Sequence, residues 1–164
     1  MTELKRIMLT HPGAISAASK PSKQLLRETE RQLGQPLGPQ LRDYLEVFGF
    51  ITFGTIEFYG VTERNGLRSD MVTQTEKFHK EYSKVNGMFV LEALDAQTLI
   101  LVDSRDLVYM YCENEDALVK IGMDVDTYML DRVRKECSSW ESQCNAEKPG
   151  TKCTWTTEDS STGG

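Results

Sequence analysis

The sequence predicts a single α+β domain with a mainly antiparallel sheet of about five to six strands, flanked by N-terminal, middle and C-terminal helices. Three observations lead to this prediction. Apolar residues recur at helical spacing between residues 22 and 48. Three strongly apolar runs follow between residues 88 and 112, joined by connections too short for a parallel crossover. A last helical pattern begins after Asp124.

The first fifty residues predict three helices. Residues 2–9 form a short helix with Leu4, Ile7 and Met8 on one side, and His11-Pro12-Gly13 ends it. Ser22 is suited to cap a helix that runs through Leu33. Pro39 is suited to the first position of the next helix, because its missing N–H would have no partner there. The inward positions are Leu25, Leu26, Thr29 and Leu33 in the second helix, and Leu41, Tyr44, Leu45 and Phe48 in the third.

A strand and a middle helix follow. Thr55 to Tyr59 alternates as a strand, with Ile56 and Phe58 on one face and Glu57 and Tyr59 on the other. Residues 60–68 form a polar loop. Ser69 or Asp70 then caps a helix to about Lys84, which Asn86-Gly87 ends. Its expected apolar positions are Met71, Val72, Thr75, Phe78 and Tyr82.

The second half of the sheet is predicted from four runs. Met88–Leu94, Thr98–Val102 and Leu107–Cys112 are antiparallel neighbours, and a turn at residues 113–116 leads to a short strand, Leu118–Ile121. Asp124 or Asp126 caps the last helix. This helix should bury Tyr128, Met129, Val133 and, at its far end, Trp140. Residues 1–144 are therefore expected to form the domain, and the polar residues 145–164 a flexible tail.

Composition is ordinary for a soluble globular protein, with 39% apolar and 27% charged residues. No apolar run approaches the roughly 20 residues of a membrane helix, and the N-terminus lacks the apolar stretch of a signal peptide. We therefore expect a cytoplasmic protein. Cys112, Cys137, Cys144 and Cys153 form no close pair. Free thiols are the expected state, while a tail disulfide or a metal site stays open as an alternative.

The net charge of −6 is concentrated in one region. Residues 92–131 carry only Arg105 and Lys120 against ten acidic residues, a net of −8. Such a field repels nucleic acid and attracts a basic partner, whose association rate it raises. The alternative is a solvated acidic rim that discourages pairing between sheet edges. The ten acids are Glu92, Asp95, Asp103, Asp106, Glu113, Glu115, Asp116, Asp124, Asp126 and Asp131.

No catalytic pattern stands out. The chain has no nucleophile elbow, no phosphate-binding loop and no dinucleotide-binding glycine motif. His79 is expected to be a surface or partly packed side chain, and His11 part of a helix stop. The acidic pairs match no calcium loop. We therefore expect neither an enzyme nor a bound cofactor or metal.

The order of elements resembles the SUKH superfamily, which includes the Smi/Knr cell-wall regulators and bacterial antitoxins. The opening motif of that family is an acidic residue, Leu-Gly, Leu-Pro, a Tyr, an apolar pair and a Gly. Leu37-Gly38-Pro39 departs slightly from the usual Leu-Pro. The remainder is similar to YobK-type antitoxins, with Tyr59-Gly60 ending a strand, and the match spans roughly residues 22–137. The residues that match the opening motif are, in order, Glu30, Leu33, Gly34, Leu37, Tyr44, Leu45 and Gly49.

This resemblance implies an immunity protein that binds one cognate toxin 1:1 and occludes it without chemistry of its own. Nuclease toxins are commonly basic, which agrees with the acidic region. The alternative is a regulatory or scaffold protein of the same fold with other protein partners. No nucleic acid or membrane is expected as a partner. Tyr109 and Tyr111 share a strand face and could belong to the interface or pack under a helix. The candidate toxin contacts are Glu57, Tyr59, Glu63, Asp103, Asp106, Tyr109, Tyr111, Glu113, Glu115, Asp116, Asp124 and Asp126.

Overall fold

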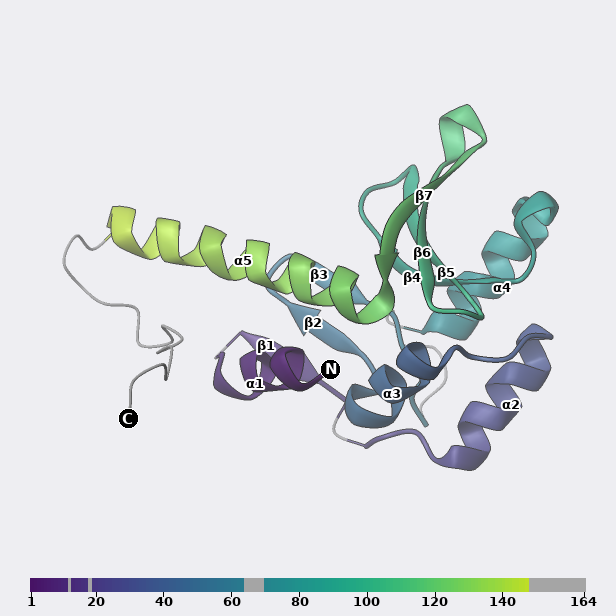
Figure 1. Ribbon diagram of the computed structural model, residues 1–164, viewed down its shortest axis with the longest axis horizontal. Coiled ribbons are helices and arrows are strands. Elements are labelled where there is room, and N and C mark those ends of the chain that lie inside the picture. Colours follow the sequence, from purple (N-terminus) through teal and green to yellow (C-terminus); the bar gives the residue numbers. More distant parts are fainter. Residues whose placement is uncertain (12, 18, 64–69, 148–164) are drawn as a thin grey trace.

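The computed structural model describes residues 1–11, 13–17, 19–63 and 70–147, and it confirms an α+β fold with exclusively antiparallel strand pairs in its two sheets. The strands form two sheets, ordered β1-β2-β3 and β4-β5-β6-β7, where the sequence predicted one (Figure 1). The elements are α1 (Thr2–Thr10), β1 (Ala14–Ser16), α2 (Lys23–Leu33), α3 (Pro39–Phe48), β2 (Ile51–Phe53), β3 (Ile56–Phe58), α4 (Met71–Glu81), η1 (Ser83–Val85), β4 (Met88–Ala93), β5 (Thr98–Asp103), β6 (Leu107–Cys112), η2 (Glu113–Glu115), β7 (Ala117–Asp124) and α5 (Val125–Glu147).

The helix boundaries follow from capping chemistry. The Ser22 hydroxyl accepts a hydrogen bond from the Leu25 N–H at 3.1 Å and so begins α2 as predicted. Asp70 does the same for α4 by accepting from the Val72 N–H at 2.9 Å. Asp124 accepts from the Thr127 N–H at 2.9 Å and begins α5. Pro39 is the first residue of α3. These predicted starts are therefore confirmed.

Two strands were not predicted. β1 and β2 contain three residues each, which is too short for alternation to be visible in the sequence. They exist because β2 pairs with both β1 and β3, so that Ile51 lies opposite Phe58. Their formation depends on tertiary contacts, since a three-residue strand has little stability of its own.

The two sheets share one hydrophobic core. Ile51, Phe53, Ile56 and Phe58 are at most 1% exposed, and the Phe58 ring meets Tyr128 of α5 at a centroid distance of 6.4 Å. The Tyr59 N–H donates to the Leu91 carbonyl at 2.7 Å and so joins the first sheet to β4. The predicted inward residues of α3 and α4 are confirmed as buried, except for Val72 and Tyr82, which are partly exposed. In α2, Leu26 and Thr29 are buried, while Leu25 and Leu33 are only partly so.

Gly60 lies against the backbone of Gly49 and Phe50, at the end of α3. A Cβ atom on Gly60 would lie 1.7 Å from the carbonyl oxygen of Gly49, so no larger residue fits without moving the backbone. The Gly49 carbonyl accepts from the Val61 N–H at 3.0 Å, and the Gly60 carbonyl accepts from the Met71 N–H at 2.8 Å. These two bonds hold the segment that follows β3 against the end of α3 and the start of α4.

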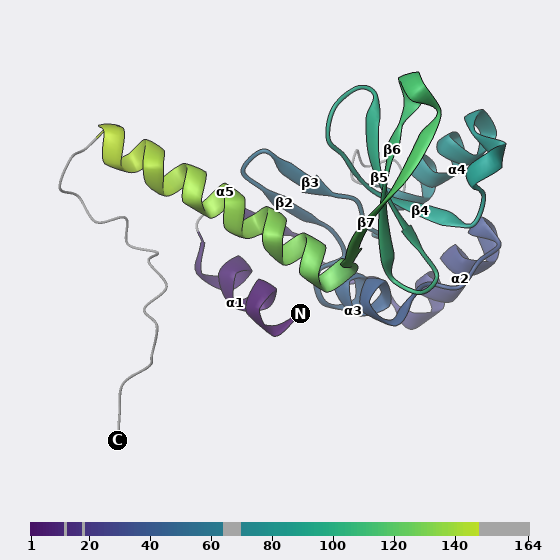
Figure 2. The same cartoon turned by 45° about the horizontal axis from the view of Figure 1, so that its top comes forward.

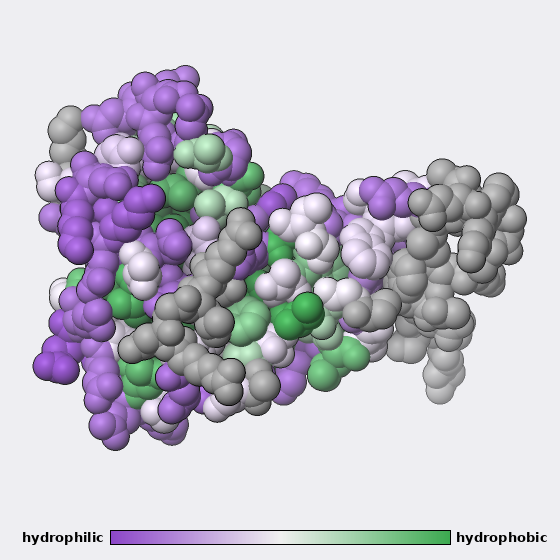
Figure 3. Space-filling model, turned by 180° about the vertical axis from the view of Figure 1, so that it is seen from behind, coloured by the Kyte–Doolittle hydropathy of each residue, from purple (hydrophilic) through white to green (hydrophobic). Residues whose placement is uncertain are grey.

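Figures 1 and 2 show where the elements lie. The turns β4–β5 and β6–β7 project together at the top, while α5 extends to the left, with α1 packed beneath its first half. Seen from behind, side chains at the α2/α4 end are mainly hydrophilic, and hydrophobic ones gather between that end and the far end of α5 (Figure 3). Helix α5 runs through Glu147, and Trp140 is half-buried against the ring of His11. The predicted flexibility of the tail concerns residues that lie almost entirely outside the described part of the chain.

Candidate functional site

The ten acidic residues of the region 92–131 fall into two groups in the structure. Six of them form ion pairs or accept backbone hydrogen bonds that stabilise the fold. They are Glu92, Asp103, Asp106, Asp124, Asp126 and Asp131. The other four lie in the two turns at the top of the second sheet. They are Asp95, Glu113, Glu115 and Asp116.

Asp106 belongs to the first group and is 4% exposed. Its two carboxylate oxygens accept from the backbone N–H groups of Gln40, at 2.9 Å, and Leu41, at 3.0 Å. A carboxylate on the β5–β6 turn therefore caps α3 from outside that helix. A Cβ on Gly38 would lie 2.1 Å from the Asp106 carboxylate, which explains why a glycine precedes Pro39.

Three more predicted contact residues lie around this cap. Asp103 is 8% exposed, and its carboxylate accepts hydrogen bonds from the Arg105 N–H at 2.9 Å and the Leu107 N–H at 3.0 Å. Gln40 bridges to both remaining residues, because its side chain donates to Asp124 and accepts from the Asp126 N–H. The Asp126 carboxylate also pairs with the N-terminal amino group of Met1 at 2.9 Å. We call Asp103, Asp106, Asp124 and Asp126 the acidic hub.

The hub corrects part of the contact prediction. Asp103 and Asp106 are buried and their oxygens already accept protein hydrogen bonds, so they offer no surface to a partner. Burial of Asp103 raises the pKa of its carboxyl, but hydrogen bonds from Leu107, Arg105 and Tyr109 outweigh this effect and hold the pKa below its usual value. Hydrogen bonds from Thr127 and Gln40 likewise lower the pKa of Asp124.

Two of the predicted tyrosine contacts are also buried. Tyr59 is 9% exposed and Tyr111 is 1% exposed. The Tyr111 ring packs edge-on against Phe78 and Tyr82 at centroid distances of 5.3 and 5.0 Å, so the face it occupies lies under α4. For Tyr111, the structure agrees with the alternative in which this strand face packs under a helix. Tyr109 is half-buried, and its hydroxyl donates to Asp103 at 3.2 Å.

The remaining predicted contacts lie in two places. Glu57 is half-buried on the three-stranded sheet opposite Thr52, and Glu63 is exposed in the segment after β3. Glu113, Glu115 and Asp116 form the β6–β7 turn, where Glu113 is partly exposed and the other two are exposed. Of these five residues, the structure brings only Glu113, Glu115 and Asp116 together.

The β6–β7 turn lies beside the β4–β5 turn. The Glu113 N–H donates to the Gln97 carbonyl at 2.9 Å, and the Asn114 side chain donates to the Gln97 side chain. Asp95 stands at the start of the β4–β5 turn, where its carboxylate accepts from the Gln97 N–H at 2.8 Å. These bonds hold four carboxylates of two turns at one end of the sheet.

A hollow of about 170 Å³ separates these turns from α4. Phe78, Val90 and Leu99 contribute apolar surface to it, while Glu81, Asp95 and Glu113 contribute carboxylates from three different elements. Lys77 also lines the hollow. We call Glu81, Asp95, Glu113, Glu115 and Asp116 the acidic tip.

The tip has the chemistry to receive a basic side chain. The apolar part of the hollow can cover the methylene groups of a lysine or arginine, and the carboxylates can accept from its charged end. Two tyrosine hydroxyls nearby stay protonated at neutral pH. Burial and the neighbouring carboxylates of Glu113 and Glu81 raise the pKa of Tyr82. Burial and the hydrogen bond that its hydroxyl donates to Asp116 at 2.7 Å raise the pKa of Tyr111.

Sequence reasoning missed Glu81 and left Asp95 out of the candidate contacts. Glu81 follows Phe78 by three residues and therefore shares its side of α4. That spacing was a usable signal, because Phe78 was expected to point inward. Only the packing of α4 against β4, however, places Glu81 beside Asp95 and Glu113.

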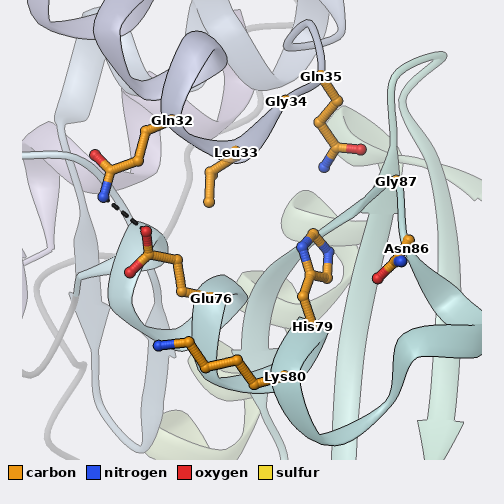
Figure 4. Close-up of a pocket in the computed structure, with 9 residues that line it drawn as sticks. All are labelled: Gln32, Leu33, Gly34, Gln35, Glu76, His79, Lys80, Asn86 and Gly87. Atoms are coloured by element: carbon orange, nitrogen blue, oxygen red, sulfur yellow. Dashed lines mark hydrogen bonds between the residues drawn. The ribbon is translucent and has the colours of Figure 1, made fainter.

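A second hollow, of about 540 Å³, lies on the other side of α4 and faces α2 (Figure 4). Gln32 donates to Glu76 across it at 2.7 Å. His79 is partly packed, as predicted, with Nε2 2.9 Å from the Met88 carbonyl oxygen. The Gln35 amide nitrogen and oxygen are buried and have no hydrogen-bond partner among the described residues. The residues around this hollow share no single charge and favour no one class of ligand.

Within the described ranges, no three His, Cys, Asp or Glu side chains converge in a way that could hold a metal ion. Cys112 and Cys137 are free thiols, and burial raises the pKa of Cys137. The side chain of Cys144 and all of Cys153 lie outside the described part. None of the helices described here is long and apolar enough to cross a membrane.

Comparison with known proteins identifies the family. A SUKH family model, described as SMI1-KNR4 cell-wall, matches residues 4–134. This match runs from the first turn of α1 into the first half of α5 and extends the resemblance seen in the sequence toward the N-terminus. Comparison with curated proteins gives no match. Because the family match covers most of its length, this chain belongs to the SMI1-KNR4 family of the SUKH superfamily.

Proposed function

We propose that the protein is an immunity protein, which binds a cognate toxin domain of basic, nuclease type and neutralises it by steric and electrostatic occlusion. The family membership is consistent with a toxin-immunity role. The observation that carries the proposal is the hollow of the acidic tip. There Glu81, Asp95 and Glu113 surround apolar side chains at an exposed end of the molecule.

The chemistry of the tip suits a protein that recognises a nucleic-acid-binding surface. Nucleases hold phosphates with Lys and Arg, so a set of carboxylates can occupy the same side chains. Charge–charge attraction of this kind mainly raises the association rate. An arginine whose stem enters the hollow would add buried apolar area, as central interface residues do.

The acidic hub does not contribute contacts in this proposal. Its oxygens are engaged with Gln40, Leu41, Arg105 and Leu107, and the hub lies at the opposite end of β5 and β6 from the tip. Of the twelve residues predicted as contacts, Glu113, Glu115 and Asp116 therefore remain at the centre of the proposed interface. Glu81 and Asp95 join them.

The test is capture of the toxin domain encoded beside the gene, followed by a triple variant, Glu81→Gln, Asp95→Asn and Glu113→Gln. The variant should fold normally and associate with the toxin roughly ten- to a hundredfold more slowly at low salt. Surface plasmon resonance at two salt concentrations measures this change. Added salt should slow the wild type more than the variant.

A matched control removes the same charge elsewhere. Glu28→Gln, Asp43→Asn and Glu141→Gln change three acids outside the tip, and this variant should bind nearly as fast as the wild type. Equal slowing in both triple variants would show that net charge, and not the tip, matters. Failure to bind any neighbouring gene product would contradict the immunity function, and tip-dependent capture of a protein that is not a toxin would favour a regulatory role.

A further inference from the structure

Strand β7 lies at an open edge of the four-stranded sheet. It has eight residues and, within the described part of the chain, pairs only with β6. The opposite edge of the sheet is covered, since the Leu91 carbonyl of β4 accepts from the Tyr59 N–H. The free edge of the other sheet, β1, is only three residues long. β7 therefore presents the longer unpaired row of backbone groups.

An open edge strand normally carries features that prevent pairing with another chain. In β7 these lie toward its C-terminal half. Gly122 has φ +82°, and the register with β6 shifts in the segment that faces Leu107 to Tyr109. The regular ladder runs from Ala117 to Lys120, and within it Leu118 and Val119 are 39% and 48% exposed. Lys120 is the one charged residue of this ladder.

We propose that this edge, Ala117–Lys120, takes up an extended basic segment of the protein partner as an added strand. This inference rests on the proposed function and specifies the conformation in which the partner binds beside the acidic tip. Charge complementarity selects the occupant, because Glu113, Glu115 and Asp116 directly precede the strand. A second copy of this chain would instead bring the same three carboxylates and a net charge of −6.

Strand addition divides recognition between backbone and side chains. Main-chain hydrogen bonds to Ala117–Lys120 hold the segment in place whatever its sequence. Successive side chains of the segment point to opposite faces of the sheet, so apolar ones can cover Leu118 or Val119. Basic side chains near the start of β7 can then reach the acidic tip, because Glu113, Glu115 and Asp116 form the β6–β7 turn, which projects from the sheet (Figures 1 and 2).

The first experiment uses two synthetic octapeptides, one alternating Val and Lys and one alternating Val and Glu. Added to the isotopically labelled full chain, the lysine peptide should shift the backbone amide signals of residues 113–121 and slow their hydrogen exchange. The glutamate peptide should leave them unchanged. No shift with the lysine peptide, or equal shifts with both, would overturn the proposal.

The second experiment compares Val119→Lys with Ile15→Lys. Both add one positive charge at an exposed apolar residue of a strand, since Ile15 is 58% exposed on β1. Val119→Lys should weaken lysine-peptide binding about tenfold, as loss of a central contact does, and Ile15→Lys should not. Equal effects would overturn the edge assignment. A dimer of the wild type in light scattering that Val119→Lys abolishes would assign the edge to a second copy instead.

The captured toxin separates the two proposals. If the toxin binds and requires the tip, but Val119→Lys binds it as tightly as Ile15→Lys does, the immunity function stands and strand addition is wrong. If no toxin is captured but the lysine peptide slows hydrogen exchange at residues 117–120, strand addition is supported and the immunity function is not.

Discussion

The acidic hub and the acidic tip both consist of carboxylates and lie at opposite ends of β5 and β6, yet their surroundings differ. In the hub, Asp106 is 4% exposed and caps α3 with both oxygens. In the tip, Glu115 is exposed in the β6–β7 turn, and none of the described residues donates a hydrogen bond to its carboxylate. The difference between these two residues is that the Asp106 oxygens meet backbone N–H groups at the start of a helix, whereas no described backbone N–H donates to the Glu115 carboxylate.

This comparison teaches how to weigh a cluster of negative charge. Helix starts leave N–H groups without partners, and a carboxylate that meets them becomes part of the fold. A carboxylate on a projecting turn meets water and keeps its charge available for long-range attraction. Hub changes should therefore alter the free energy of unfolding, and tip changes should alter association.

The largest effect is expected from Asp106→Asn. An amide offers one oxygen where the carboxylate offers two, so one buried N–H at the start of α3 loses its acceptor and the charge is lost as well. The free energy of unfolding should fall by about 2 kcal/mol, measured by urea denaturation. The matched tip change Glu115→Gln should stay within about 0.5 kcal/mol of the wild type. Equal losses in the two variants would remove the distinction between hub and tip.

A smaller effect is expected from acid. The pKa values of Asp103 and Asp124 lie below their ordinary values in the folded protein, so their contribution is fully present above the unfolded-state pKa of about 3.9. It should be lost as the pH falls from about 5 through the folded-state values. Urea denaturation between pH 7 and pH 3 measures this loss. Asp124→Asn should reduce the pH dependence, and a dependence equal to that of the wild type would exclude Asp124 as a source.

The smallest effect is expected from Lys77→Gln at the tip. Lys77 lines the hollow together with Glu81, Asp95 and Glu113, and its charge opposes a basic ligand. Its removal should tighten binding of a synthetic arginine-rich peptide about two- to fivefold without changing stability. Fluorescence anisotropy measures the affinity. Unchanged or weaker binding would show that the hollow does not receive the basic side chain.

Much of the fold could be predicted because its signals are local. Ser22, Pro39, Asp70 and Asp124 begin helices through contacts within a few residues, and sequence spacing reveals such contacts. The strands β4, β5 and β6 are long and apolar enough to be recognised as runs. The three-residue strands β1 and β2 are held only by their partners, which explains both their omission and the prediction of one sheet instead of two.

The candidate site was predictable only in part. The acidic turn Glu113–Asp116 was identified as charged and exposed, and the structure places it at the tip. Asp103 and Asp106 looked equivalent to it in the sequence, yet both are buried. Asp106 meets the start of α3, 65 residues earlier in the chain, whereas Asp103 accepts from N–H groups of its own turn. Tyr111 was assigned to a strand face correctly, but α4 covers that face.

The helix starts, the antiparallel strands β4 to β7, the acidic balance and the family could all be recognised from the amino-acid sequence. Each of these depends on neighbours in the chain or on composition. Tertiary contacts determine which carboxylates stabilise the fold and which face the solvent. They bring the Asp106 carboxylate to the N–H groups of α3, and they place Glu81 of α4 beside Asp95 and Glu113. A carboxylate's role depends on the donors that surround it, and the two that engage Asp106 come from a distant part of the chain.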